Sequence, residues 1–157
     1  MCHTPPSRTP TAATSESMSS PAEDSTELQT FLRDGISSYE QLETLLLLRT
    51  RHDETFSPRS VAAALRVTEP IAAASLDHLC SLSLLDVRIG AESLLFRYSP
   101  GKVALAGLVD QLAESHTRNP LAVMTLMNAN AIERVRTQAR RLFADAFILG
   151  RKRDKDG

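Results

Sequence analysis

The stretch FSPRSVAAALRVTEPIAAASLDHLCSLSLLD, residues 56–86, carries most of the information about the fold of this chain. Ser57 followed by Pro58 is typical of a helix start, because serine caps free backbone N–H groups and proline fits the first turn. The short helix that follows ends at a turn that begins at Arg66. Thr68 then begins a longer helix, whose apolar side consists of Ala72, Leu76, Leu79 and Leu82. The stretch therefore predicts two helices joined by a tight turn.

Apolar and polar residues alternate after the second helix. Residues 85–89 and residues 94–98 place apolar side chains at every second position, which is typical of half-buried strands. The four residues from Gly90 to Ser93 are suited to a turn between them. These segments together predict a β-hairpin.

A third helix precedes the pair. Residues 38–49 begin with Ser38 and Gln41 in the spacing of a capping box. The apolar face of this helix consists of Leu42, Leu45, Leu46 and Leu48. Residues 55–57 then predict a brief extended segment before the next helix starts.

The order over residues 38–99 is helix, short strand, short helix, tight turn, longer helix and hairpin. This order resembles the winged helix-turn-helix module of MarR- and ArsR-like bacterial transcription regulators, over about residues 38–100. The likeness is also local, since His78 to Asp86 resembles the end of that family's recognition helix and its first wing strand, with Ser83 where glycine is usual. The resemblance implies a mainly α fold with a small β-hairpin and a C-terminal helical extension. It also implies a DNA-binding transcriptional regulator.

The resemblance further implies which residues meet DNA, because that family places the second helix of the pair in the major groove. The groove-facing positions would be Thr68, Glu69, Pro70, Ala73, Ala74 and Asp77. The nearest cations would be Arg59 and Arg66 on the preceding helix and turn, Arg88 and Arg97 on the wing, and Lys102 just after it. Contacts between these cations and phosphates would give salt-dependent binding to double-stranded DNA.

The predicted groove face carries none of the Arg, Lys, Asn or Gln side chains that usually read base edges. Two hypotheses therefore remain open. In the first, the chain regulates transcription and discriminates sequences largely by DNA shape or through the wing. In the second, the chain is a protein-interaction adaptor that keeps the fold, docks a protein partner on this face and does not bind DNA sequence-specifically.

The N-terminal region divides into two parts. Residues 1–25 are rich in Ser, Thr and Pro and predict a disordered tail, since they lack the apolar surface needed to offset the entropy of ordering. Structure is expected to begin near Ser25 with an amphipathic helix that ends at Gly35. We therefore assign residues 26–100 to a winged-helix domain with an N-terminal helix.

Residues 101–150 are assigned to a helical extension, and residues 151–157 to a charged tail. Within the extension we expect a helix over 102–116, a short helix over 121–127, and a last helix closed by Gly150. The last helix is predicted to be capped by Asn130 with Glu133. Its apolar stripe consists of Ile132, Val135, Ala139, Leu142, Ala146 and Leu149.

Two interpretations of this stripe remain open. It is either the seam of a homodimer, as the resemblance suggests, or the inner face of a helix that folds back on the winged-helix domain. Basic residues flank it, and residues 118–157 hold nine basic and four acidic side chains. This helix is not suited to a membrane surface, because its stripe is rich in alanine and its aromatic residues lie beside Asp145.

Composition and motifs exclude several classes of function. The chain has 157 residues, a formal net charge of −1 and 24% charged residues, which is typical of a globular protein. Its two cysteines are too few for a disulfide framework, so a cytoplasmic location is expected. No catalytic or phosphate-loop motif is present, and the histidines and cysteines lack metal-site spacing, so we predict no enzyme, cofactor or metal. No apolar run approaches the ~20 residues that span a bilayer.

Overall fold

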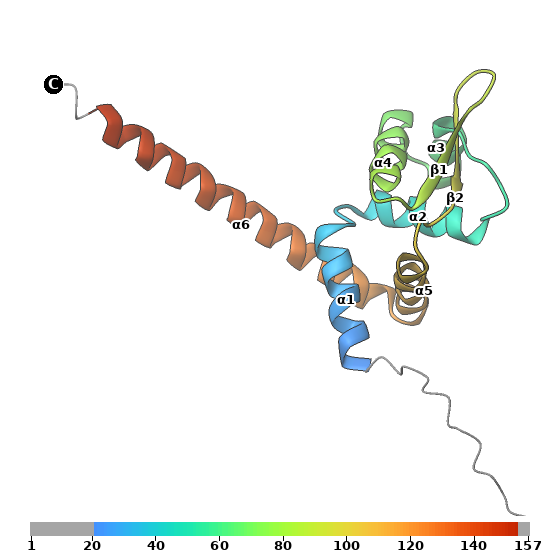
Figure 1. The fold of residues 1–157 in the computed structure, drawn as a ribbon, viewed down its shortest axis with the longest axis horizontal. Helices are drawn as coiled ribbons and strands as arrows, with labels where there is room; N and C mark the ends of the chain where they lie inside the picture. Colours follow the sequence, from blue (N-terminus) through green and yellow to red (C-terminus); the bar gives the residue numbers. More distant parts are fainter. Residues whose placement is uncertain (1–20, 154–157) are drawn as a thin grey trace, which may run out of the picture.

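The computed structural model describes the backbone of residues 21–153 and the side chains of residues 26–148. Its elements in chain order are α1 (Pro21–Asp34), α2 (Tyr39–Thr50), α3 (Pro58–Leu65), α4 (Glu69–Ser81), β1 (Leu85–Ile89), β2 (Leu94–Tyr98), α5 (Val103–Arg118) and α6 (Pro120–Arg153). The expected order of helices followed by a hairpin is confirmed. Figure 1 shows α2, α3, α4 and the hairpin grouped at one end, with α1 and α5 below them and α6 extending away.

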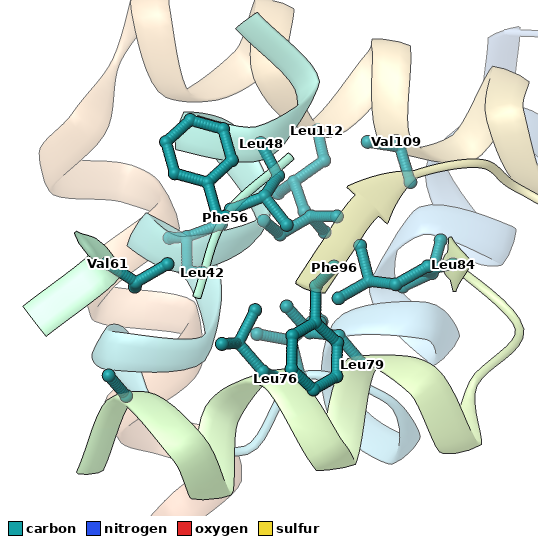
Figure 2. Packing of buried hydrophobic residues seen from close by; sticks show 14 of the residues in the cluster. Leu42, Leu48, Phe56, Val61, Leu76, Leu79, Leu84, Phe96, Val109 and Leu112 are labelled. Atoms are coloured by element: carbon teal, nitrogen blue, oxygen red, sulfur yellow. The ribbon is translucent and has the colours of Figure 1, made fainter. Parts of the chain in front are cut away.

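The core of the winged module lies between the three helices and the base of the hairpin. The strands pair antiparallel, with Leu85 opposite Tyr98 and Ile89 opposite Leu94. Phe56 forms a separate bridge with Phe96, which confirms the brief extended segment before α3. Figure 2 shows the Phe96 ring, which is 2% exposed, lying over Leu76 and Leu79 of α4. Burial of these side chains fixes the orientation of α4.

Two of the predicted caps are only partly correct. Ser57 caps α3 as expected, in a full capping box with Ser60. Ser38 accepts the Gln41 N–H at 3.2 Å, but the Gln41 side chain accepts from the Ser37 N–H at 2.8 Å, so the capping box is half formed. Thr68 occupies the N-cap position of α4 without a side-chain hydrogen bond. The start of α4 therefore depends on packing more than on its cap.

Ser83 lies in the left-handed backbone region, at φ 60°, where the resemblance places glycine. The turn needs this conformation because the Ser83 N–H bonds Cys80 O at 2.9 Å, and its carbonyl accepts the Gly101 N–H at 2.9 Å. These bonds close α4 and lead the chain into β1. A residue with a Cβ is strained in this region.

Replacing Ser83 by glycine is expected to raise the free energy of unfolding by roughly 0.5–1 kcal/mol, because relief of strain exceeds the added entropy of the unfolded chain. Urea unfolding followed by circular dichroism measures the change. Ala74→Gly, at an exposed position inside α4, is the matched control and should lose about 1 kcal/mol. A loss at both positions would contradict the argument from strain.

The hairpin is buried only at its base. Leu85 and Phe96 are buried, whereas Val87 and Leu94 are each 46% exposed and Ile89 is 92% exposed. The expectation of strands half-buried along their whole length is therefore wrong for the outer half, because the hairpin extends beyond the helices that it packs against (Figure 1).

The expected break between residues 127 and 132 is wrong, because α6 is one continuous helix of 34 residues. Asn130 lies inside this helix and caps nothing, and the helix also continues through Gly150 instead of ending there. Asparagine lowers helix propensity only slightly, and a single glycine costs about 1 kcal/mol, so neither residue stops a helix by itself. The true cap is Asn119, whose Oδ1 accepts the Ala122 N–H at 3.1 Å.

The N-terminal boundary also differs from the prediction. The helix of α1 begins at Pro21, so residues 21–25 are helical and do not belong to the expected tail. Proline is favoured in a first helical turn, and this signal was missed. The expected disorder of residues 1–20, and the last residues of the charged tail at 154–157, lie outside the described residues.

The described part of α6 beyond its first turns does not fold back. Val123 and Met127 are buried against the body, but every side chain from Arg140 to Ile148 is exposed. The interpretation of this helix as packed on the winged-helix domain is therefore wrong for the outer part, from Arg140 to Ile148. Among residues 21–153, no helix is long and apolar enough to cross a membrane.

Candidate nucleic-acid interface

The predicted groove face of α4 is open. Thr68, Glu69 and Asp77 are exposed and Ala73 is partly exposed. The opposite side of the helix is buried in the core through Ala72, Ser75, Leu76 and Leu79. Figure 1 shows α4 beside the hairpin at the end of the molecule that lies away from α5 and α6. Neither α1 nor α6, as far as the structure describes them, covers the predicted face, so within residues 21–153 this face is accessible to a partner.

The two wing arginines lie close together on one carboxylate. Arg97 is directly opposite Asp86 in the hairpin, and Arg88 is two residues further along β1. Arg88 Nε lies 3.6 Å and Arg97 Nη2 3.8 Å from Asp86 Oδ2. All three side chains are substantially exposed, so each ion pair contributes less than about 1 kcal/mol to stability. Asp86 orients both guanidinium groups and also offsets part of their charge.

The remaining predicted cations lie on two other elements. Arg59 is exposed on α3, and Arg66 is the exposed C-cap of α3, at φ 56°. Lys102 is exposed immediately before α5, at the base of the hairpin and away from its turn. Within the described residues these three side chains form no ion pair. Their charge is therefore available to an incoming anion.

The Cys80 thiol near the C-terminal end of α4 has two carboxylates as neighbours. Burial raises the pKa of the Cys80 thiol, and the nearby carboxylates of Asp77 and Asp86 raise it further. The Cys80 side chain is partly exposed. The thiol therefore stays protonated at neutral pH and is a poor nucleophile.

In a Cys2→Ser variant, Cys80 is expected to react with iodoacetamide several-fold more slowly in the folded protein than in urea at the same pH. Partial burial limits the access of the reagent, and the raised pKa lowers the fraction of the thiol that is present as reactive thiolate. Mass spectrometry over time gives the two rates. Equal rates would show that the environment of α4 does not protect the thiol.

Three contacts that sequence reasoning missed fix the position of α4 and α6 relative to α1. His78 Nε2 lies 2.6 Å from Gly35 O, just after α1. The Arg134 guanidinium donates to Arg33 O and Ser37 O, both at 3.0 Å. The segment between α1 and α2 therefore connects α4 with α6. No sequence signal could have found these contacts, because the acceptors are backbone carbonyls.

The predicted dimer stripe is exposed along α6. Ile132, Val135 and Leu142 are 55%, 67% and 65% exposed, Ala146 is exposed and Ala139 is partly exposed. The side chain of Leu149 lies outside the described residues. Within residues 26–148, no group of three or more His, Cys, Asp or Glu side chains could hold a metal ion.

Comparison with known proteins finds likeness only among solved structures. No family model and no curated protein matches the chain. MepR, a transcription regulator of the Staphylococcus aureus multidrug efflux pump MepA, is 15% identical, with a TM-score of 0.47 over 80% of this chain and 91% of MepR. Reduced HlyU from Vibrio cholerae is 16% identical, with a TM-score of 0.45 over 61% of this chain and 93% of HlyU. The adhesin competence repressor AdcR from Streptococcus pyogenes is 13% identical, with a TM-score of 0.43 over 85% of this chain and 92% of AdcR.

The fold is assigned from the chain's own elements. Helix α2, the α3–turn–α4 pair and the β1–β2 hairpin follow one another in the expected order and share one core. The chain therefore has a winged helix-turn-helix fold, and the resemblance predicted over about residues 38–100 is confirmed at the level of fold.

Proposed function

We propose that this protein is a DNA-binding transcriptional regulator that inserts α4 into the major groove and places its wing on the adjacent backbone. One observation carries the proposal. The face of α4 that contains Thr68 and Asp77 is exposed, and it lies next to a hairpin that carries two arginines. A helix held on one side by a core and free on the other has the geometry that groove insertion requires.

Most of the affinity would come from phosphates. Arg59, Arg66, Arg88, Arg97 and Lys102 supply up to five contacts, and each contact contributes about −0.9 to the slope of log K against log salt concentration. The exposed side chains of α4 add little direct discrimination between bases, because alanine, threonine and carboxylates make few specific pairs. Sequence preference would then come mainly from DNA shape and deformability.

The long helix supports a homodimer as the binding form. The side chains of residues 140–148 in its outer part are all exposed in the described chain, and most helical stability in proteins comes from packing of an apolar face. An apolar stripe on such a segment is stabilised when a second copy covers it. A two-fold dimer would present two α4 helices to half-sites about one helical turn apart, roughly 34–36 Å.

The acidic residues favour a competing function. Glu69 and Asp77 lie on the exposed face of α4, and Asp86 holds both wing arginines. A face with these carboxylates repels phosphate and suits a basic protein partner. In this alternative the chain is an adaptor, and its affinity for duplex DNA is no higher than that of other slightly acidic proteins.

Selection of bound duplexes from a random pool distinguishes the two functions. A regulator is expected to enrich a site with two related halves, and its binding should weaken steeply between about 50 and 200 mM salt. The variant Asp77→Arg tests the same face, since it should increase duplex affinity if α4 enters the groove. Failure of the wild type to retain any duplex at low salt would reject the regulator.

A further inference from the structure

Three aliphatic side chains form an exposed apolar tip on the hairpin. Ile89 is 92% exposed, and Val87 and Leu94 are each 46% exposed. Ile89 pairs directly with Leu94, and Val87 pairs with Phe96, so these side chains share one face of the hairpin. The same face is buried at its base through Phe96. The apolar surface of the core therefore continues outward to the last residue pair before the turn.

A tight turn follows directly after this apolar tip and keeps the end of the hairpin narrow. The Gly90 N–H bonds Ser93 O at 2.9 Å, which closes the loop directly beyond the Ile89–Leu94 pair. A Cβ at Gly90 would lie 2.7 Å from that same carbonyl, so the tight turn requires glycine. The strands of a hairpin lie about 4.8 Å apart, and the minor groove of B-DNA is about 6 Å wide. The Ile89–Leu94 pair lies directly before this four-residue turn, so its side chains can approach such a groove from the edge.

The small size of the tip favours DNA over a protein partner. A stable protein interface buries about 800 Å² on each partner, and three aliphatic side chains fall well short of this. A wedge between two base pairs needs only one or two apolar side chains, and isoleucine and leucine are among those that proteins use for it. The charges nearby fit the same partner, because Arg88 and Arg97 lie on the opposite face of the hairpin. Two acidic groups of the hairpin oppose the contact, Glu92 in the turn and Asp86 beside the two arginines.

We propose that Ile89, supported by Leu94, inserts into the minor groove as an apolar wedge that unstacks one base step and kinks the duplex. This inference rests on the proposed regulator function, and it explains how such a regulator would distinguish one DNA sequence from another. The cost of unstacking depends on the step, and TA and CA/TG steps are the most easily kinked. A wedge would therefore select such a step under the wing, although the exposed side chains of α4 add little direct discrimination between bases.

The test compares Ile89→Ser and Leu94→Ser with Val103→Ser on the duplex selected by the wild type. Val103 is the matched control because it is an aliphatic residue, 91% exposed, outside the hairpin at the start of α5. Energy transfer between dyes at the duplex ends reports the bend, and 2-aminopurine placed at the step under the wing reports unstacking. A wedge kinks DNA by roughly 20–90°.

We expect the wild type and Val103→Ser to give the same bend and the same 2-aminopurine signal. Ile89→Ser should lose most of both and bind about 10-fold more weakly, with Leu94→Ser in between. A bend that is unchanged in Ile89→Ser overturns the wedge, even if affinity falls, and leaves the regulator intact because the wild type still binds. A wild type that binds no duplex overturns both. Thermal unfolding checks that the variants fold, and Ile89→Ala repeats the test with a smaller change in polarity.

Discussion

Replacing Leu142 by glutamate is expected to convert a dimer of this chain into a monomer and to weaken association at least ~100-fold, about 3 kcal/mol. Leu142 lies in the apolar stripe of α6 and is 65% exposed in the single chain. In a two-fold seam the same residue is buried on both copies, so one substitution places two carboxylates in an apolar interface. Burying an unpaired charge is far more costly than losing a methyl contact.

Ile148→Glu is the matched control for Leu142→Glu. Ile148 is also 65% exposed and on the same helix, but six residues further along, which places it about 120° around the helix axis from Leu142 and outside the stripe. Light scattering across a concentration series measures the mass of each variant. We expect a dimer for the wild type and for Ile148→Glu, and a monomer for Leu142→Glu. A wild type that is monomeric throughout, or two variants that dissociate equally, contradicts a seam on this face.

The winged module could be predicted because its signals are local. Ser57 with Pro58 gives the helix start, and the alternation from Leu85 to Tyr98 gives the strands. Such signals fix hydrogen bonds between residues that are close in the chain. The sequence even indicated the strained turn at Ser83, because the family that the chain resembles usually has glycine at this position.

The long helix was harder to predict, because the residues that seem to interrupt it carry weak signals. Asn130 suits a cap, but a cap forms only where the chain leaves the helix, and nothing between Pro120 and Arg153 forces it to do so. Packing on α1 and α5 decides this region. The Arg134 contacts with Arg33 O and Ser37 O join residues about a hundred positions apart, and such pairs leave no periodic trace.

The candidate site was predictable as a set of residues and not as a set of contacts. The exposed positions of α4 follow from helical periodicity once Leu76 and Leu79 are assigned to the core. The shared partner of Arg88 and Arg97 follows only from strand register, which places Asp86 opposite Arg97. Strand register depends on the turn at Gly90, so the ion pairs of Asp86 with Arg88 and Arg97 could be identified only from the structure.

The double variant Arg88→Ala with Arg97→Ala is expected to weaken duplex binding ~10–100-fold near 0.1 M salt and to reduce the salt slope by about 2. The two exposed guanidinium groups lie on the face of the hairpin opposite Ile89, where they can contact phosphates. Loss of two phosphate contacts lowers the number of counterions released on binding, which is what the slope measures. Fluorescence anisotropy at several salt concentrations gives both quantities.

Two further variants show whether the effect belongs to the wing. Arg136→Ala with Arg140→Ala removes the same charge from exposed positions on α6 and should leave the slope unchanged. Asp86→Asn removes the carboxylate that lies within 4 Å of both wing arginines, so it should tighten binding several-fold and make the slope steeper. If the wing and α6 pairs lower affinity equally, the contribution is net charge and the wing has no specific role. If Asp86→Asn weakens binding while the protein stays folded, the carboxylate acts mainly by orienting the two arginines. Its repulsion of the DNA phosphates is then the smaller effect.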